Sequence, residues 1–310
     1  MKLRAIDDTL REGLSRLGLE SAAVEPLAGD ASHRRFFRVA LAGEATVVAA
    51  LYPPGGEDQV DHDARVQRWA REHGLPVPEA LGVAGLVTVS EDLGSENLSA
   101  VAAREEETLQ DQLLLALAAF QACPHAAAPN PPFDAALFRR ELAAFEQYAA
   151  VVATRDATRF LDNLALRLAT HTYRLLHRDF HLHNLFWKEG RVRAVDFQDM
   201  RGGPDTYDLA SLLRERGASG AGLDEEQLLE NAASRLAWAP GWHQRYFECA
   251  AQRGLKVVGT FRRLAAAGRQ EYERWLPEAS CRALEALRAV GAPDDVLSML
   301  AGGPKTSGGV

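Results

Sequence analysis

Apolar positions in the first ninety residues change from a helical to a strand periodicity. Leu10, Leu14 and Leu17 recur at spacings of three and four, which is typical of an amphipathic helix. The following stretch is rich in β-branched and aromatic residues and is broken by turn signals at residues 29–32 and 42–43. The predicted elements are a helix over residues 3–17, antiparallel strands over 24–28, 36–41 and 45–52, a helix over 60–73 and a strand over 86–90.

The pattern becomes helical after Gly94. Segments rich in alanine and leucine predict helices over residues 108–122, 135–153, 159–170 and from 207 to about 300. Two short apolar runs, 185–187 and 192–195, are joined by Lys188-Glu189-Gly190 and predict a β-hairpin within this helical part. We therefore expect an α+β chain. Its predicted parts are a sheet-rich lobe over residues 1–93, a helical lobe over 94–300 that carries the hairpin and the substrate site, and a disordered tail over 301–310.

Composition and charge limit the classes of partner. The 310 residues carry a net charge of −8, which argues against nucleic acid or an anionic membrane as the main partner, because both require clustered positive charge. The three cysteines are far apart in the sequence and indicate neither a disulfide framework nor a zinc ribbon. The N-terminal segment lacks the apolar core of a signal peptide, and no long apolar run predicts a membrane span. We expect a soluble protein of the reducing cytoplasm.

The segment HRDFHLHN, residues 177–184, supports two alternative sites. In a metallohydrolase, the side chains of His177, Asp179, His181 and His183 would project from one face of an extended strand and hold a divalent ion such as zinc. Such sites usually take further ligands from elsewhere in the chain, and the downstream His243 has no acidic neighbour.

The second alternative is the catalytic loop of a phosphotransferase. Asp179 and Asn184 match the arrangement H-R-D-x-x-x-x-N, in which the aspartate accepts the proton of the substrate hydroxyl and the asparagine binds magnesium. Asp196 follows the predicted hairpin, where the same template has its second metal-binding aspartate. Phosphoryl transfer requires oxygen ligands for magnesium and a carboxylate that orients the nucleophile, and these three residues provide them. We favour this alternative.

Several motifs extend this interpretation over nearly the whole chain. They are HRDFHLHN, VDFQD, GGPDTYDLASLL, PLAGDASHRRFFRV, EDLG, PPFDAALFRREL and LKVVGTFRRL. Together they resemble the aminoglycoside phosphotransferase and choline kinase superfamily, and more narrowly the bacterial anomeric kinases of N-acetylmuramate and N-acetylglucosamine. The resemblance implies a bilobal protein-kinase-like fold, ATP and Mg²⁺ as cofactors, and transfer of phosphate to the C1 hydroxyl of an amino sugar.

The resemblance also implies roles for individual residues. Asp179 would be the catalytic base, Asn184 and Asp196 would bind magnesium, and Asp208 would brace the catalytic loop, although an aspartate at a helix start is often only an N-cap. His177 would be structural. The implied nucleotide contacts are the hinge Glu91 to Leu93 and the phosphate turn Gly29, Asp30, Ala31 and Ser32. Kinases of this fold generally have a phosphate-binding lysine on the third strand, and this chain has none there. Either an arginine replaces it, with Arg34, Arg35 and Arg38 as candidates, or magnesium and backbone amides bind the phosphates alone. The predicted site includes Arg35.

The acceptor is the least determined part of the prediction. Gln198, Asp199, Asp205 and His33 are candidate substrate contacts, together with Asp179. An anomeric hydroxyl is more acidic than an ordinary alcohol, so a modest base such as Asp179 would suffice. Among small-molecule kinases, the alternative is an aminoglycoside or other alcohol phosphotransferase. Aminoglycosides are polycations, so they would require a strongly acidic site. From a different class, the alternative is a catalytically inactive pseudokinase that binds a ligand.

Overall fold

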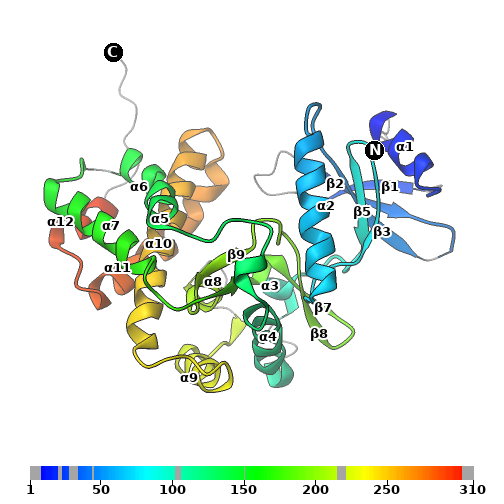
Figure 1. The fold of residues 1–310 in the computed structure, drawn as a ribbon. Coiled ribbons are helices and arrows are strands. Elements are labelled where there is room, and N and C mark those ends of the chain that lie inside the picture. The colour runs from blue at the N-terminus through cyan, green and yellow to red at the C-terminus, as the bar shows by residue number, and fades with distance from the viewer. Residues whose placement is uncertain are drawn as a thin grey trace, which may run out of the picture. The chain divides into compact units, whose positions relative to one another are not determined.

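The computed structural model describes residues 8–19, 23–27, 34–43, 45–101, 106–149, 151–214 and 221–301 (Figure 1). The chain divides into two compact units: unit 1 comprises Met1–Ser95 and Phe186–Gln198, and unit 2 comprises Glu96–Leu185 and Asp199–Val310. The first division lies close to the boundary expected after residue 93. The hairpin, however, which the sequence placed with the helical lobe, groups with unit 1.

Unit 1 is built on a five-stranded antiparallel sheet with the order β1-β2-β3-β5-β4. Its elements are α1 (Asp8–Arg16), β1 (Ala23–Leu27), β2 (Arg35–Ala40), β3 (Thr46–Leu51), α2 (Glu57–Glu72), β4 (Ala80–Ala84) and β5 (Val87–Glu91). The three predicted N-terminal strands are present and antiparallel, within two residues of their expected bounds in the described chain. The sequence did not predict β4, whose segment ALGVA has a glycine in place of a strong strand former.

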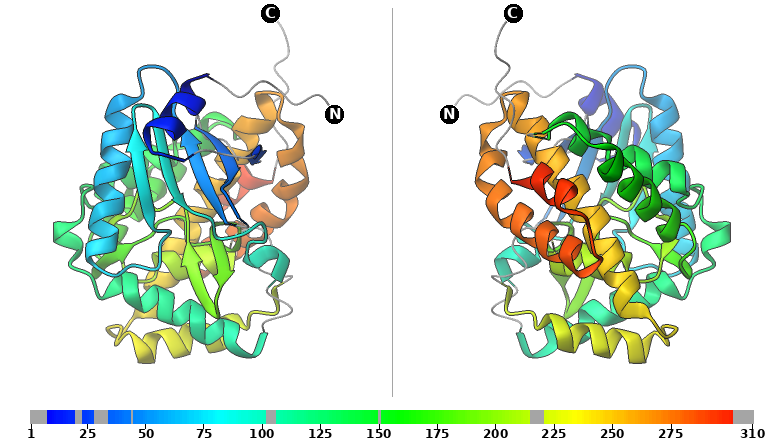
Figure 2. Two further views of the ribbon diagram at one scale, coloured as in Figure 1. Left: turned by 90° about the vertical axis from the view of Figure 1, so that its right-hand side faces the viewer. Right: turned by 90° about the vertical axis from the view of Figure 1, so that its left-hand side faces the viewer.

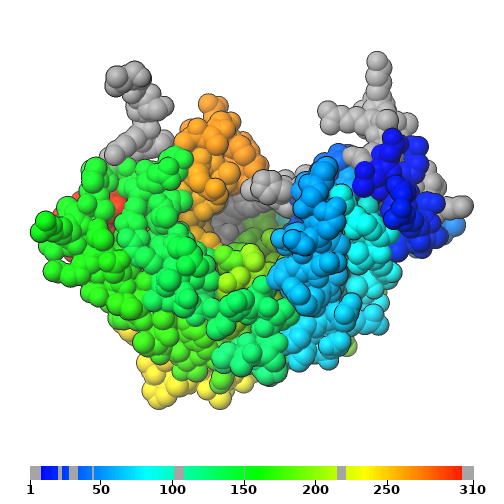
Figure 3. All heavy atoms as spheres, turned by 45° about the horizontal axis from the view of Figure 1, so that its top comes forward, coloured from blue at the N-terminus to red at the C-terminus, as the bar shows by residue number. Residues whose placement is uncertain are grey.

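Alternation along β3 explains how two helices cover this sheet. Val47, Ala49 and Leu51 face α1 and pack with Leu10 and Leu14. The intervening positions face α2, where Ala50 and Tyr52 pack with Val60. Because successive side chains of a strand point to opposite faces, β3 has two apolar faces. Figure 3 shows α2, in medium blue, on the surface of this unit.

The hairpin consists of β7 (Leu185–Lys188) and β8 (Arg191–Ala194). Its two turn residues, Glu189 and Gly190, have φ of 52° and 74°, as a type I′ turn requires, and this turn matches the twist of the strands. The hairpin is attached to unit 1 by hydrogen bonds: the Ala194 N–H donates to the Pro76 carbonyl at 2.7 Å, and Lys188 Nζ donates to the Asp92 carbonyl at 2.9 Å. These contacts are why the hairpin groups with the sheet.

Unit 2 is mainly helical. Its elements are α3 (Leu98–Val101), α4 (Glu106–Gln121), a 3₁₀ turn (His125–Ala127), α5 (Ala135–Glu141), α6 (Ala143–Gln147), α7 (Arg155–Leu168), β6 (Tyr173–Leu176), a 3₁₀ turn (Leu182–Asn184), β9 (Arg201–Pro204), α8 (Tyr207–Arg214), α9 (Glu225–Arg235), α10 (Trp242–Ala266), a 3₁₀ turn (Gln270–Trp275), α11 (Leu276–Ala289) and α12 (Asp294–Leu300). The single helix predicted over residues 135–153 is wrong, because the chain forms α5 and α6 and leaves the helix after Gln147. Thr154 is itself extended and caps the next helix by accepting from the Ala157 N–H, so a helix cannot continue through it.

Helix α10 is the central element of unit 2. It packs against α6, α7, α8 and α11. The right-hand view of Figure 2 shows the helices of the C-terminal part of the chain, α10 to α12, in yellow to red. At Gly259 its backbone approaches α6 so closely that an added Cβ would lie 2.3 Å from the Phe145 nitrogen. Within the described residues, no helix is long and apolar enough to cross a membrane.

A short antiparallel pair, β6 and β9, was not predicted from the sequence. Leu176, the last residue of β6, pairs with Arg201, the first of β9. Because β6 leads directly into HRDFHLHN, this pairing brings Asp199 and Arg201 beside the start of that segment.

Candidate active site

The segment after β6 is a loop held by a buried carboxylate. Asp208, at the start of α8 and fully buried, accepts hydrogen bonds from the backbone N–H of His177 at 2.7 Å and of Arg178 at 2.8 Å. Arg178 has φ +82°, in the left-handed region that non-glycine residues rarely adopt. The two bonds to Asp208 fix this backbone, which agrees with the predicted role of Asp208 as a brace.

Asp179 lies among positive charges contributed by α10. Arg253 Nη2 is 3.2 Å from Asp179 Oδ1, and Arg253 Nη1 donates to the Arg178 carbonyl at 2.8 Å. Burial opposes ionisation of Asp179, but the charges of Lys256, Arg253 and Arg178 outweigh it and hold its pKa well below the usual range. Asp179 is therefore a carboxylate at neutral pH, suited to orient a hydroxyl group.

A second buried carboxylate, Glu141 at the end of α5, organises the same cations. It pairs with Arg178 at 2.7 Å and with Lys256 at 3.2 Å, and it accepts from Gln252 Nε2 at 3.0 Å. Burial raises the pKa of Glu141, but Lys256 and Arg178 lower it more, to about 2. Glu141 and Lys256 lie in two of the motifs that carry the resemblance, but no role was predicted for either residue. Nothing in their own segments signals that they lie beside the catalytic loop.

Asn184 closes the loop after a single 3₁₀ turn. Its Nδ2 donates to the Asp179 carbonyl at 3.1 Å, so the amide group uses its donor end inside the loop and the oxygen Oδ1 is the end suited to ligate a cation. Asn184 directly precedes β7 and belongs to unit 2, whereas Asp196 follows β8 and belongs to unit 1. Asp196 has φ +62° and a half-exposed carboxylate that accepts from Arg34 Nη2 at 3.1 Å in unit 1. An amide oxygen and an exposed carboxylate are hard oxygen donors of the type that magnesium prefers, and they fit the predicted cofactor.

The histidines do not form the alternative metal site. The ring of His177 is fully buried and packs edge-on against Phe120 at 5.4 Å and Phe180 at 5.9 Å, so His177 is structural, as expected. Across the described parts of the chain, no three His, Cys, Asp or Glu side chains are grouped to hold a metal ion. The structure thus gives the metallohydrolase interpretation no support.

The predicted nucleotide contacts all belong to unit 1. Gly29, Asp30, Ala31 and Ser32 lie outside the described residues, as does His33, which was predicted to contact the substrate. Glu91 ends β5, where its carboxylate accepts from Arg193 at 2.8 Å, and the Leu93 side chain is buried. Between them, Asp92 is clamped by Arg38 at 2.5 and 3.0 Å and accepts from the Gly94 N–H, which orders the segment expected to be the hinge. The roles of Glu91 and Leu93 stay predictions.

The predicted substrate residues have different environments. Asp199 is mostly exposed and pairs with Arg178 at 2.6 Å, which places it beside the catalytic loop in unit 2. Gln198 is half-buried at the end of the unit 1 segment. Asp205 is only 1% exposed, and both of its carboxylate oxygens accept from Arg245, at 3.0 and 2.8 Å. The expectation that Asp205 contacts substrate has no support in this geometry, because a buried carboxylate with a bidentate arginine is already saturated.

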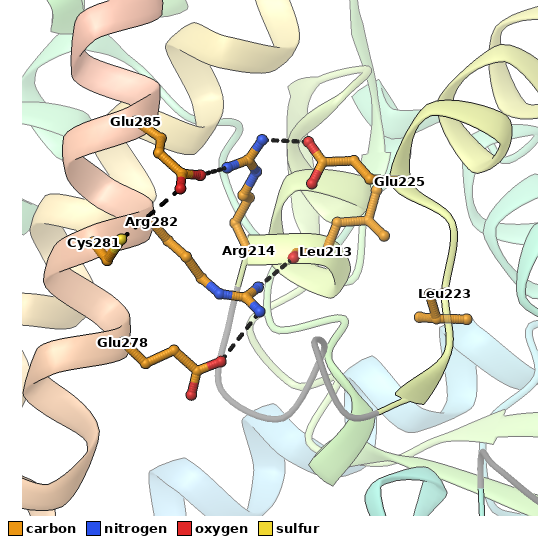
Figure 4. A pocket seen from close by; sticks show the side chains of 8 residues that line it. All are labelled: Leu213, Arg214, Leu223, Glu225, Glu278, Cys281, Arg282 and Glu285. Atoms are coloured by element: carbon orange, nitrogen blue, oxygen red, sulfur yellow. Dashed lines mark hydrogen bonds and ion pairs between the residues drawn. The ribbon is translucent and has the colours of Figure 1, made fainter.

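Unit 2 also contains a pocket of about 450 Å³ between α8, α9 and α11 (Figure 4). Arg214 and Arg282 cross it and are neutralised by glutamates: Arg214 pairs with Glu225 and, at 2.7 Å, with Glu285, and Arg282 pairs with Glu278 at 3.1 Å. None of the predicted site residues lines this pocket. Its polar groups tie three helices together, so we assign it a structural role.

Comparison with known proteins identifies the family. Residues 23–247 match the model of the phosphotransferase enzyme family. The chain belongs to this family. It is therefore a phosphotransferase with a hydroxyl acceptor, as the motifs predicted.

Two sequence relatives and two solved structures refine this placement. The chain is 31% identical over 81% of its length to the N-acetylmuramate/N-acetylglucosamine kinase of Neisseria meningitidis, 81% of which is covered. It is 29% identical over 78% of its length to the enzyme of the same name from Pseudomonas aeruginosa, 77% of which is covered. A thermostable mutant of aminoglycoside phosphotransferase APH(4)-Ia superposes with a TM-score of 0.65 at 15% identity, covering 90% of this chain and 98% of that one. Choline kinase LicA from Streptococcus pneumoniae gives a TM-score of 0.63 at 16% identity, with 91% and 98% covered. These neighbours confirm the predicted kinase-like α+β fold.

Proposed function

We propose that this phosphotransferase uses ATP and Mg²⁺ to phosphorylate the anomeric C1 hydroxyl of an amino sugar of the N-acetylglucosamine, N-acetylmuramate or glucosamine type. The observation that carries the proposal is the loop from His177 to Asn184, in which Asp208 fixes the backbone and Arg253 holds Asp179 as a carboxylate. Two relatives named for N-acetylmuramate and N-acetylglucosamine support the sugar as acceptor. Asn184 and Asp196 would hold Mg²⁺, which when bound neutralises charge on the transferring phosphate.

The charges around Asp179 favour a weakly basic role for this residue. A carboxylate among three cations attracts a proton poorly, so it orients a hydroxyl more effectively than it deprotonates one. An anomeric hydroxyl, which is more acidic than other sugar hydroxyls, needs the least assistance from such a base. The loop is thus better matched to C1 than to an ordinary alcohol.

The same charges disfavour a polycationic acceptor such as an aminoglycoside. In unit 2, the carboxylates nearest the loop are already paired: Glu141 with Arg178 and Lys256, and Asp179 with Arg253. A polycation would have to compete with these built-in cations and would gain little from carboxylates that are already neutralised. A neutral or anionic sugar meets no such competition.

The proposal is tested with purified protein, ATP, Mg²⁺ and a panel of N-acetylglucosamine, N-acetylmuramate, glucosamine, galactosamine, glucose and kanamycin. ADP release identifies the acceptor and ³¹P NMR locates the phosphate. We expect a sugar 1-phosphate from the wild type and its loss in Asp179→Asn, whereas Glu230→Gln, which changes an exposed side chain on α9, retains activity. Phosphate on kanamycin would contradict the sugar assignment, and nucleotide binding without turnover on any acceptor would favour the pseudokinase alternative.

A further inference from the structure

The strand that usually carries the phosphate-binding lysine in this fold has none here, and unit 1 shows what its arginines do instead. Arg38 is committed to Asp92, with contacts of 2.5 and 3.0 Å. Arg35 is exposed on β2, with its guanidinium 5.9 Å from the Phe37 ring. Lys188, the only lysine among the described residues of unit 1, donates to the Asp92 carbonyl at 2.9 Å. Arg38 and Lys188 are therefore both engaged at Asp92, and Arg35 lies on the exposed face of β2.

Arg34, the residue before β2, has a different environment. Its Nη1 donates to Asp63 on α2 at 2.8 Å, and its Nη2 donates to Asp196 at 3.1 Å. The Arg34 side chain is 15% exposed and Asp63 is 5% exposed, whereas Asp196 is 54% exposed. One arm of the guanidinium is thus anchored on a buried partner, and the other lies on an accessible carboxylate that is also the predicted metal ligand.

The anchor is rigid. Besides Arg34, the Asp63 carboxylate accepts from Tyr52 Oη at 2.7 Å and from Gln59 Nε2 at 2.6 Å. Burial and the contact with Asp63 raise the pKa of Tyr52 to about 12, so the hydroxyl stays protonated and keeps donating. The guanidinium also lies over the rings of Phe36 and Tyr52, at 5.3 and 5.8 Å, which restricts its plane. A charged side chain that is held this firmly loses little entropy when it binds an anion.

We propose that Arg34 is the phosphate-binding cation of this enzyme and that Asp63 is its positioning residue. Arg34 keeps its contact with Asp63 and exchanges Asp196 for a phosphate oxygen when nucleotide binds. The planar fork of arginine suits this exchange, since one pair of N–H groups stays on the anchor while the other reaches the phosphate. The proposal rests on the proposed function only in requiring that the chain binds a nucleotide.

The first test measures binding of adenosine and of Mg–ADP by calorimetry. In Arg34→Gln we expect the affinity for Mg–ADP to fall by about tenfold or more, which is the loss of one charge-assisted contact, while the affinity for adenosine is unchanged. Arg68→Gln is the matched control, because Arg68 is exposed on α2 and is not part of the predicted site, and this variant binds both ligands as the wild type does. Equal losses for adenosine and Mg–ADP would make Arg34 a structural residue and overturn the proposal, as would wild-type Mg–ADP affinity in Arg34→Gln.

The second test addresses the exchange and the anchor. In EDTA, Asp196→Asn should bind metal-free ADP several-fold more tightly than the wild type, and most of this gain should disappear when Arg34→Gln is added. Asp63→Asn should weaken Mg–ADP binding without affecting adenosine, and it should have no further effect in the Arg34→Gln background. Additive effects in either pair would contradict the coupling that the geometry implies.

These outcomes separate the two proposals. A chain that binds Mg–ADP through Arg34 but phosphorylates no sugar would contradict the proposed function and leave this inference standing. A sugar kinase whose Arg34→Gln variant binds Mg–ADP normally would contradict the inference alone.

Discussion

Substitution of Glu141 by glutamine tests whether the buried charge cluster stabilises unit 2. Lys256 and Arg178 hold the pKa of Glu141 at about 2, against an ordinary value of 4.5. Because the pKa is lowered in the folded state, the stabilisation is fully present above pH 4.5 and is lost as the pH falls toward 2. A difference of roughly 2.5 pKa units corresponds to about 3 kcal/mol, of which about 2 kcal/mol is lost by pH 3.

The measurement is the free energy of unfolding in urea, followed by far-UV circular dichroism, between pH 7 and pH 3. Glu141→Gln is expected to be less stable than the wild type by about 3 kcal/mol at pH 7, and the gap should narrow to about 1 kcal/mol at pH 3. Glu230→Gln is the control, because the Glu230 side chain is exposed on α9 and interactions of exposed charges contribute at most about 1 kcal/mol. A gap between wild type and Glu141→Gln that does not change with pH would refute the assignment.

Three further substitutions test the loop, the helix contact and the metal ligand. Asp208→Ala leaves the backbone N–H groups of His177 and Arg178 without their acceptor. We therefore expect the free energy of unfolding, measured in urea, to fall by about 2 to 5 kcal/mol and kcat to be lost. A variant that is active and as stable as the wild type would show that Asp208 does not brace the loop. A glycine-to-alanine change in a helix ordinarily stabilises it by about 1 kcal/mol. Gly259→Ala should nevertheless lower Tm, because the new Cβ would lie 2.3 Å from the Phe145 nitrogen. A raised Tm in a thermal melt would show that α6 can move away. Asn184→Ala should raise the Mg²⁺ concentration that gives half-maximal activity by at least about tenfold in a metal titration. If this Mg²⁺ concentration does not change, Asn184 is not a magnesium ligand.

The catalytic loop illustrates what a sequence motif can specify. The order H-R-D-x-x-x-x-N predicted Asp179 and Asn184, and the resemblance in the segment TYDLASLL predicted the brace Asp208. Both predictions were possible because they depend on short stretches of sequence. The three N-terminal strands were also predictable, since alternation and turn residues are local signals. The pairing of β6 with β9 was not, because each segment is four residues long and is a strand only through its partner.

The charges that surround the loop came from residues distant in sequence. Arg253, Lys256 and Glu141 lie on α10 and α5, and nothing in their own segments indicates that they meet at Asp179. The selection of Arg34 among three neighbouring arginines has the same origin, because it depends on Asp63 of α2 and on Asp196 after the hairpin.

The sequence by itself predicted the three N-terminal strands, the hairpin, the family and the candidate residues for the transfer chemistry, because periodicity, turns and motif spacing are local signals. Only the tertiary structure decided which charged side chains pair with one another. Ion pairs form between segments that packing brings together, and burial then sets how strongly each partner shifts the other's pKa. Asp205 shows the difference: its sequence context suggested a sugar contact, and its burial against Arg245 makes it part of the scaffold.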